Sequence, residues 1–276
     1  MHPYWPADPD DLEREYSPSS RVGGSSAPFV ADYEARSAIA SATLGRRLEV
    51  LGGGHRVVAA AAGAPLLVFV HGGYWQALSA AASTYLAPGA LALGWSYAAL
   101  EYTLAPEADV GTMVDECRGG LAEVVARVRR LVGDVGPVVV AGHSAGAHLA
   151  ALMAVAAEPP VAVRRVVLVS GVFDLRPLVA TTVNDTLGLD APGAGSLSPM
   201  LLPVVPPCPD GATEVVVTWG DDDTEAFAAQ SRAYADVLRA AGSPVVELEC
   251  AGRHHFDIVD DLVDPHTALG AAVVRG

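Results

Sequence analysis

The sequence predicts an α/β fold in which a mostly parallel central sheet is covered by helices on both faces. Six short apolar runs rich in β-branched residues recur along the chain, with helical stretches between most of them. Strands that are apolar along their whole length are typical of sheets buried on both faces, and alternation with helices favours parallel pairing. With 276 residues and 51% hydrophobic content, the chain has enough apolar material for one large core, so we expect a single domain over residues 1–276.

The first part of the chain is expected to lie outside the main alternation. Residues 1–28 are polar and contain several prolines, which predicts a loop-rich N-terminal arm. A helix is expected over residues 29–42. Extended segments at 47–51 and 56–60 flank a run of three glycines, so they are expected to form a hairpin.

The remaining elements follow from the apolar runs. Strands are expected over residues 66–70, 96–100, 137–142, 165–170, 214–219 and 244–249. The longest helices are expected over residues 113–132, 145–157 and 225–241. Residues 172–208 interrupt the alternation with six prolines. We expect them to form a small cap-like insertion over the C-terminal edge of the sheet, where α/β folds bind ligands.

Charge excludes several classes of site. The chain has 32 acidic and 17 basic residues, a formal net charge of −15 and no lysine. A phosphate-binding loop with its lysine and a Schiff-base lysine are therefore excluded. Because a negative protein repels phosphate backbones, we expect no nucleic-acid partner.

Cysteine usage and the N-terminal sequence indicate the compartment. Cys117, Cys208 and Cys250 are an odd number and none belongs to a CxxC pair, so reduced thiols are expected. The N-terminus lacks a basic segment followed by an apolar one, which argues against a signal peptide. No apolar run reaches the roughly 18 to 20 residues of a membrane helix. We therefore expect a cytoplasmic protein with no membrane partner.

The stretch GHSAGAH follows a predicted strand and precedes a predicted helix. Gly142, Ser144 and Gly146 satisfy the pattern G-x-S-x-G. In this strand-to-helix turn the serine is exposed as a nucleophile, and the glycines avoid collisions with neighbouring strands. Ser144 is therefore the candidate nucleophile, and the alternative is a serine that merely caps the helix.

A metal site is not expected. His143 and His148 are five positions apart, so on a helix their side chains point in different directions and cannot share one ion. No other histidine, cysteine or acidic cluster has convincing ligand spacing. The sequence predicts no metal and no cofactor.

Two late loops contain candidates for the base and the acid that orients it. The order serine, acid, histidine resembles that of α/β-hydrolases, in which the acid follows a late strand and the histidine follows the last one. Three aspartates follow the strand at 214–219, and we favour Asp223, with Asp222 as the alternative. His254 and His255 follow the last strand, and we favour His255.

The stretch HGGYW follows the buried strand at 66–70. In α/β-hydrolases the loop after an early strand and the residue after the nucleophile donate the N–H groups that stabilise an oxyanion. Gly72, Gly73 and Ala145 are the candidate donors here. The alternative for the glycines is a plain structural turn.

Several longer stretches carry a more specific resemblance, from about residue 12 to residue 263. They are EYSPSS, HGGYWQ, GHSAGAHLAALM, LVSGVFDLRPLV with the ND at 184–185, LSP, GDDDTEAFAAQS and HFDIVDDL. Together they resemble the kynurenine formamidases, also called arylformamidases, whereas esterases of the lipase type more often carry HGGG and GDSAGG. The single aspartate of the family's acid loop aligns with Asp223, and the histidine of its HF pair aligns with His255. The early stretch EVLGGGHRVVAAAAGAP is shorter than usual in the family.

The resemblance implies hydrolysis of N-formyl-L-kynurenine to formate and L-kynurenine in tryptophan degradation, with a small-molecule substrate as the main partner. A tight acyl pocket under the HGGYW loop and a larger aromatic site are expected. Tyr74, Trp75 and Phe173 are expected to line the larger site, and ordinary packing is the alternative for each. A small-ester carboxylesterase or a deformylase of a related arylformamide in secondary metabolism is the alternative function. A catalytically silent binding protein is a third hypothesis, and a homodimer is left open.

Overall fold

A computed structural model describes residues 4–205 and 213–275 and shows the predicted α/β architecture. Its centre is an eight-stranded sheet of order β1-β2-β4-β3-β5-β6-β7-β8. The strands are β1 (Glu49–Val50), β2 (Arg56–Val58), β3 (Leu66–Val70), β4 (Ser96–Leu100), β5 (Val138–His143), β6 (Arg165–Val169), β7 (Glu214–Gly220) and β8 (Val245–Cys250). Pairing is parallel from β4 to β8, whereas β1 and β2 are antiparallel additions at one edge.

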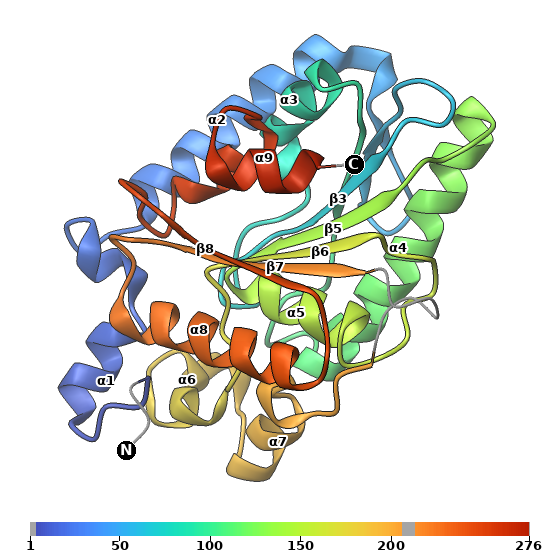
Figure 1. The fold of residues 1–276 in the computed structure, drawn as a ribbon. Helices are drawn as coiled ribbons and strands as arrows, with labels where there is room; N and C mark the ends of the chain where they lie inside the picture. Colours follow the sequence, from blue (N-terminus) through green and yellow to red (C-terminus); the bar gives the residue numbers. More distant parts are fainter. Residues whose placement is uncertain (1–3, 206–212, 276) are drawn as a thin grey trace.

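Helices cover both faces of the sheet. The α-helices are α1 (Pro9–Glu15), α2 (Ala27–Leu44), α3 (Ala87–Ala92), α4 (Val110–Val132), α5 (Ala145–Ala154), α6 (Asn184–Leu187), α7 (Ala191–Ser196), α8 (Glu225–Ala240) and α9 (Ala268–Val274). Short 3-10 helices are η1 (Pro18–Arg21), η2 (Gly45–Arg47), η3 (Ala81–Leu86), η4 (Arg176–Ala180), η5 (Pro199–Leu201) and η6 (Ile258–Val263). In Figure 1, α2, α3 and α9 lie on one side of the sheet and α4, α5 and α8 on the other.

The strands are apolar throughout because both of their faces are buried. In β3, Leu66, Val68 and Val70 pack into the core beneath α4, α5 and α8, whereas Leu67 and Phe69 pack on the opposite face. Successive side chains of a strand point to opposite faces, so a two-layer cover requires apolar residues at every position. This requirement explains why the apolar runs located the strands to within about one residue.

The expectation of a loop-rich N-terminal arm is wrong in part, because residues 9–15 form α1 and residues 18–21 form η1. Asp8 caps α1 by accepting hydrogen bonds from two backbone N–H groups of its first turn, and Pro9 begins the helix. Leu12 and Tyr16 then enter the core. A seven-residue helix with so few apolar positions has no readable period, and its stability comes from this packing.

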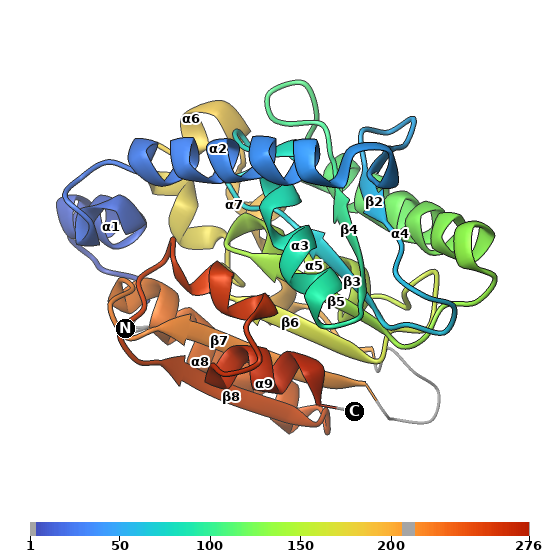
Figure 2. The same cartoon turned by 90° about the horizontal axis from the view of Figure 1, so that it is seen from above.

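The arm lies beside the predicted insertion. The described part of the insertion, residues 172–205, contains η4, α6, α7 and η5. Figures 1 and 2 show α1 near α6, beyond the sheet, and Glu13 of α1 bonds Thr182 of the insertion. Two segments far apart in sequence therefore meet at the same end of the sheet.

Two further expectations concern the cysteines and the membrane. Cys117 and Cys250 are buried free thiols, and burial raises the pKa of both, whereas Cys208 lies outside the described residues. Among the described residues, no helix is long and apolar enough to cross a membrane.

Candidate active site

Ser144 occupies a strained turn between β5 and α5. Its backbone has φ 54° and ψ −122°, a conformation that a residue with a side chain adopts only when the surrounding structure imposes it. A Cβ added to Gly142 would lie 2.2 Å from the carbonyl oxygen of Gly146, and one added to Gly146 would lie 2.1 Å from that of Val70. Glycine is therefore required at both positions, because backbone packs directly against backbone around the serine.

Asp223 and His255 meet at the ends of β7 and β8. The two carboxylate oxygens of Asp223 lie 3.1 and 3.2 Å from Nδ1 of His255, and both side chains are almost completely buried. A Cβ on Gly220 would lie 2.1 Å from the carbonyl oxygen of Arg253, so the two loops are in backbone contact. With Nδ1–H donating to the carboxylate, Nε2 is free to accept a proton.

The neighbouring candidates face elsewhere. Asp222 is half exposed and forms an ion pair with Arg21 at 2.6 Å. Asp221 accepts hydrogen bonds from backbone N–H groups of the loop after β8. His254 uses Nδ1 to accept the N–H of Phe256 at 3.1 Å. Of the alternatives that the sequence left open, the structure therefore brings Asp223 and His255 together.

The loop after β3 passes directly over Ser144. A Cβ on Gly72 would lie 3.0 Å from Cβ of Ser144, and Gly73 has a φ of +97° that favours glycine. Ala145 is the first residue of α5, and the first N–H groups of a helix have no acceptor within the helix. Gly72, Gly73 and Ala145 therefore lie on two sides of the same serine.

Glu101 and Tyr102, which the sequence did not single out, hold the loop after β3 in place. Nε2 of His71 lies 3.3 Å from Oε1 of Glu101, and the His71 ring stacks on Tyr102 with 4.3 Å between ring centroids. The Tyr102 hydroxyl donates to the carbonyl oxygens of His71 and Gly72. The available signal was position, because the dipeptide EY at 101–102 follows the end of the strand beside β3.

His143 and His148 are buried and serve as hydrogen-bond donors. Nε2–H of His143 donates to the carbonyl oxygen of His255 at 2.8 Å, and Nε2–H of His148 donates to that of Leu197 at 2.7 Å. Burial, with the nearby His255, lowers the pKa of His143 to about 3, and burial lowers that of His148 to about 4. Within the described ranges, no group of three or more His, Cys, Asp or Glu side chains could hold a metal ion.

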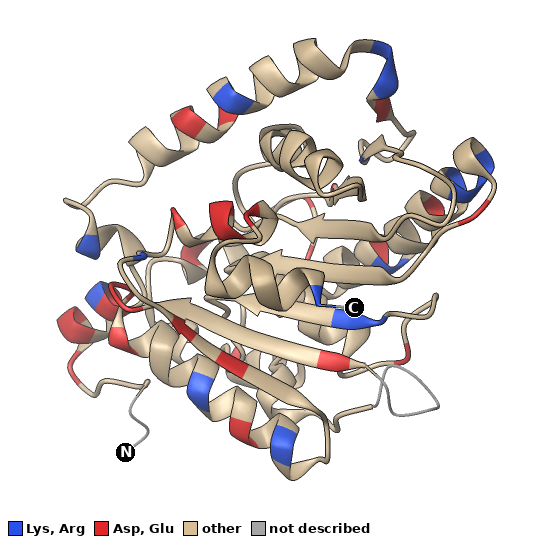
Figure 3. Ribbon diagram, turned by 45° about the horizontal axis from the view of Figure 1, so that its top comes forward, with Lys and Arg blue, Asp and Glu red and all other residues tan. Residues whose placement is uncertain are grey.

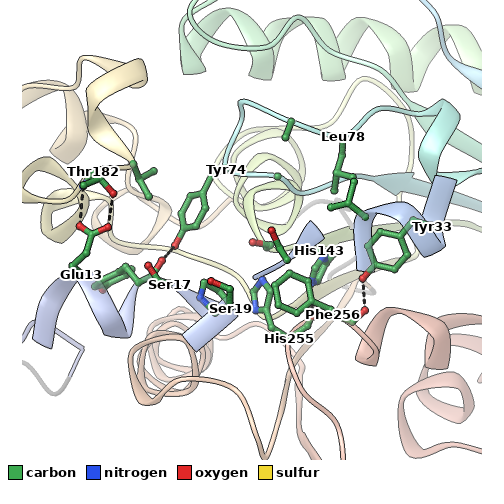
Figure 4. Close-up of a pocket in the computed structure, with 18 residues that line it drawn as sticks. Glu13, Ser17, Ser19, Tyr33, Tyr74, Leu78, His143, Thr182, His255 and Phe256 are labelled. Atoms are coloured by element: carbon green, nitrogen blue, oxygen red, sulfur yellow. Dashed lines mark hydrogen bonds between the residues drawn. The ribbon is translucent and has the colours of Figure 1, made fainter. Parts of the chain in front are cut away.

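A pocket of about 280 Å³ opens over the serine and the histidine. Ser144, His255 and Tyr74 contribute to its wall, together with Thr182 and Val183 of the insertion. Most of the remaining wall comes from the arm and the first turns of α2, which the sequence analysis did not connect with the site. These arm and α2 residues are Glu13, Tyr16, Ser17, Pro18, Ser19, Ser26, Val30 and Tyr33 (Figure 4).

Tyr74 connects the arm with the pocket wall. Its hydroxyl donates to the carbonyl oxygen of Tyr16, and burial raises its pKa. A separate small cavity of about 20 Å³ lies beside the loop after β3, with Gly72, Leu78 and His143 in its wall. Its volume corresponds to roughly one water molecule.

Trp75 and Phe173 do not line the pocket, so those two expectations are wrong. Both side chains are fully buried in the core. The Trp75 ring meets His148 edge-on at 5.1 Å, and Phe173 stacks on Tyr234 at 4.4 Å. Adjacent residues of a tight loop point in different directions, so Tyr74 reaches the pocket while its neighbour enters the core.

Comparisons with known proteins identify the family and the fold of the chain. Residues 67–257 match a family model described as the alpha/beta hydrolase fold. The kynurenine formamidase of Danio rerio is 30% identical over 215 residues, which cover 76% of this chain and 72% of that protein. The Drosophila melanogaster kynurenine formamidase is 32% identical over 206 residues, covering 72% and 68%. A Silicibacter crystal structure, provisionally described as a thioesterase, matches with a TM-score of 0.80 and 28% identity over 96% of this chain and 99% of that chain.

Proposed function

Because the chain belongs to the kynurenine formamidase family of the α/β-hydrolase superfamily, we propose that it hydrolyses N-formyl-L-kynurenine to formate and L-kynurenine. This reaction belongs to tryptophan degradation. The observation that carries the proposal is that Ser144 and His255 line one pocket and that Asp223 meets Nδ1 of the same histidine, in a chain whose relatives include kynurenine formamidases.

In the proposed mechanism, Oγ of Ser144 attacks the formyl carbon while Nε2 of His255 takes its proton. Asp223 orients the imidazole and stabilises its protonated form. The N–H groups of Ala145 and of Gly72 or Gly73 donate to the oxyanion, and such a donor contributes on the order of 2.7 to 4 kcal/mol.

The second half of the reaction reverses the proton transfer. Protonated His255 gives its proton to the aniline nitrogen, so kynurenine leaves and formyl remains bonded to Oγ of Ser144. Neutral His255 then deprotonates a water molecule that attacks the formyl carbon. The tetrahedral intermediate collapses to formate, and the proton returns to the serine.

The pocket over the serine suits an aromatic leaving group. Its volume is about 280 Å³, and Tyr74, Tyr33 and Phe256 in its wall offer aromatic surfaces for a substituted aniline. A formylated arylamine places such a group on the leaving side of the bond that is cleaved.

Two alternative functions use the same residues. One is the hydrolysis of an ester or thioester, and the other is the deformylation of a related arylformamide in secondary metabolism. The Silicibacter neighbour described as a thioesterase favours an ester-type substrate. The same nucleophile, base and oxyanion donors act on esters as well as on amides, so the fold does not choose between them.

A substrate series separates these candidates. One extra methyl group in an accommodating pocket changes kcat/KM by about 10 to 200-fold. A pocket that fits only a formyl group should discriminate more strongly. We therefore expect kcat/KM for N-formylkynurenine to exceed that for N-acetylkynurenine by roughly 200-fold or more. Formanilide, which lacks the amino-acid tail, should fall between them. A flat profile led by p-nitrophenyl acetate would exclude the formamidase and favour the esterase.

The nucleophile is tested by Ser144→Ala. We expect kcat for N-formylkynurenine to fall by roughly 10⁴-fold or more. The unfolding temperature should not change, because the close backbone packing at Gly142 and Gly146 holds the turn without the serine hydroxyl. Ser41→Ala on α2, outside the pocket wall, is the matched control and should keep full activity. Turnover by Ser144→Ala comparable to that of Ser41→Ala would remove the assignment.

We also propose a cytoplasmic enzyme. Cys117 and Cys250 are free thiols within the core, and free buried cysteines are typical of proteins made in a reducing compartment.

A further inference from the structure

We propose that Glu13 binds the ammonium group of the substrate's amino-acid tail and so selects α-amino acids among formylated arylamines. This inference rests on the proposed function, because it assigns one end of the same pocket. Glu13 belongs to α1, in the arm that was expected to be loop-rich.

Glu13 lies at one end of the pocket that also holds Ser144 and His255, where it can meet the tail of a substrate. Figure 4 shows Glu13 and Thr182 at one end of the pocket and Tyr33 and Leu78 at the other, with His255 between them. In N-formylkynurenine the amino-acid tail extends from the ring carbon beside the formamide. With the formamide at Ser144, the tail points along the pocket toward one of these ends, and the end with Glu13 is the polar one.

The Glu13 carboxylate is fixed in place and keeps free acceptor sites. Its Oε2 accepts the backbone N–H of Thr182 at 2.9 Å, and its Oε1 accepts the Thr182 hydroxyl. A carboxylate offers about four lone-pair sites, so two remain for an ammonium group. A preorganised acceptor loses little side-chain entropy when the ligand binds.

The negative charge of Glu13 favours the substrate's ammonium group over its carboxylate as the group that Glu13 binds. Among the described wall residues, Glu13 is the one carboxylate and none is an arginine, and the chain has no lysine. Acidic positions lie around this end of the sheet, with basic positions among them (Figure 3), and Arg14 and Arg21 are paired with Asp11 and Asp222. The substrate carboxylate is left to neutral hydroxyls, such as those of Ser17 and Ser19, which also line the pocket.

The test is Glu13→Gln with N-formylkynurenine. Glutamine keeps the shape of the side chain: its carbonyl oxygen accepts the Thr182 N–H, and its amide donates to the Thr182 hydroxyl. We expect KM to rise roughly tenfold or more, as for loss of a hydrogen bond to a charged group, with kcat within about twofold. Glu34→Gln, which removes the same charge from an exposed position of α2, should leave KM unchanged.

A second substrate separates recognition from a structural role. In 4-(2-formamidophenyl)-4-oxobutanoate the tail lacks the amino group, and its KM should be the same for wild type and Glu13→Gln. An equal rise in KM for both substrates would show that Glu13 only shapes the arm, and no rise for N-formylkynurenine would show that it does not bind the tail. Either result overturns the inference alone, whereas a wild type that cleaves p-nitrophenyl acetate but not N-formylkynurenine overturns the proposed function as well.

Discussion

At the scale of single residues, three consecutive aspartates have three different partners. Asp223 meets His255, Asp222 meets Arg21, and Asp221 accepts backbone N–H groups. Burial separates them further, since the Asp223 side chain is fully buried whereas that of Asp222 is 53% exposed. Replacing each carboxylate by an amide therefore has very different consequences.

Asp223→Asn should lower kcat by roughly 10⁴-fold, because an asparagine cannot hold the imidazole in the tautomer that leaves Nε2 free. Asp222→Asn removes one exposed ion pair and should change stability by about 1 kcal/mol or less, with kcat within about twofold. Steady-state kinetics and thermal unfolding of the two variants check this. A larger loss of kcat in Asp222→Asn would assign the orienting role to that residue instead.

At this scale the sequence predicts which residues are the catalytic candidates better than it predicts which side chains contact one another. The order of Ser144, Asp223 and His255 along the chain was readable because each follows a strand end, and the parallel sheet brings such ends together. The roles of Trp75 and Phe173 were not readable, because the direction of a loop side chain depends on backbone angles that the sequence does not reveal. Glu13 was missed because nothing local connects the arm with a loop more than 150 positions later.

At the scale of elements, α4 contains two adjacent glycines with different surroundings. A Cβ on Gly119 would have no neighbouring atom within 4 Å, whereas one on Gly120 would lie 2.5 Å from the His55 ring. A Cβ on Gly53 would lie 2.8 Å from the same ring, and Nδ1 of His55 accepts the N–H of Glu101. Glu101 in turn contacts His71, so this packing supports the loop after β3.

These two glycines should respond to alanine with opposite signs. Gly119→Ala should stabilise the protein by up to about 1 kcal/mol, since alanine favours the helix. Gly120→Ala should destabilise it by about 1 to 3 kcal/mol through overpacking and should lower kcat by displacing Glu101. Urea unfolding of both variants measures the free energies, and a stabilised Gly120→Ala would show that His55 can move aside.

The elements themselves were largely predictable. The predicted strands and the hairpin appear where the apolar runs and the glycine turn indicated, because buried strands leave little freedom in composition. The arm was not predictable, since α1 owes its stability to Leu12 and Tyr16 packing against distant residues. Tertiary packing of this kind leaves no periodic signal in a short segment.

At the scale of the whole molecule, two buried neutral histidines link stability to pH. Burial holds the pKa of His143 at about 3 and that of His148 at about 4, against about 6.5 in an unfolded chain. Below pH 6.5 the unfolded chain therefore binds protons that the folded protein does not. Stability contributed by these groups is complete above pH 6.5 and is lost as the pH falls toward 3 or 4.

By pH 5 each histidine should have cost about 2 kcal/mol of unfolding free energy relative to neutral pH. His148→Gln, which keeps a donor for the Leu197 carbonyl, should lose about half of this pH dependence. Urea unfolding of wild type and variant at pH 7.5 and pH 5 tests the expectation. Equal losses in the two proteins would mean that His148 is charged in the folded state.

The origin of the pocket wall has a consequence for how such a protein changes over evolutionary time. The residues assigned to bond breaking sit at strand ends, where backbone contacts at Gly142, Gly146 and Gly220 forbid almost any substitution. Many of the pocket residues that would choose the substrate sit on the arm and the insertion, where most side chains face the pocket or solvent. Duplicated copies can therefore diverge in substrate while inheriting the same reaction, largely through mutations in two short surface segments.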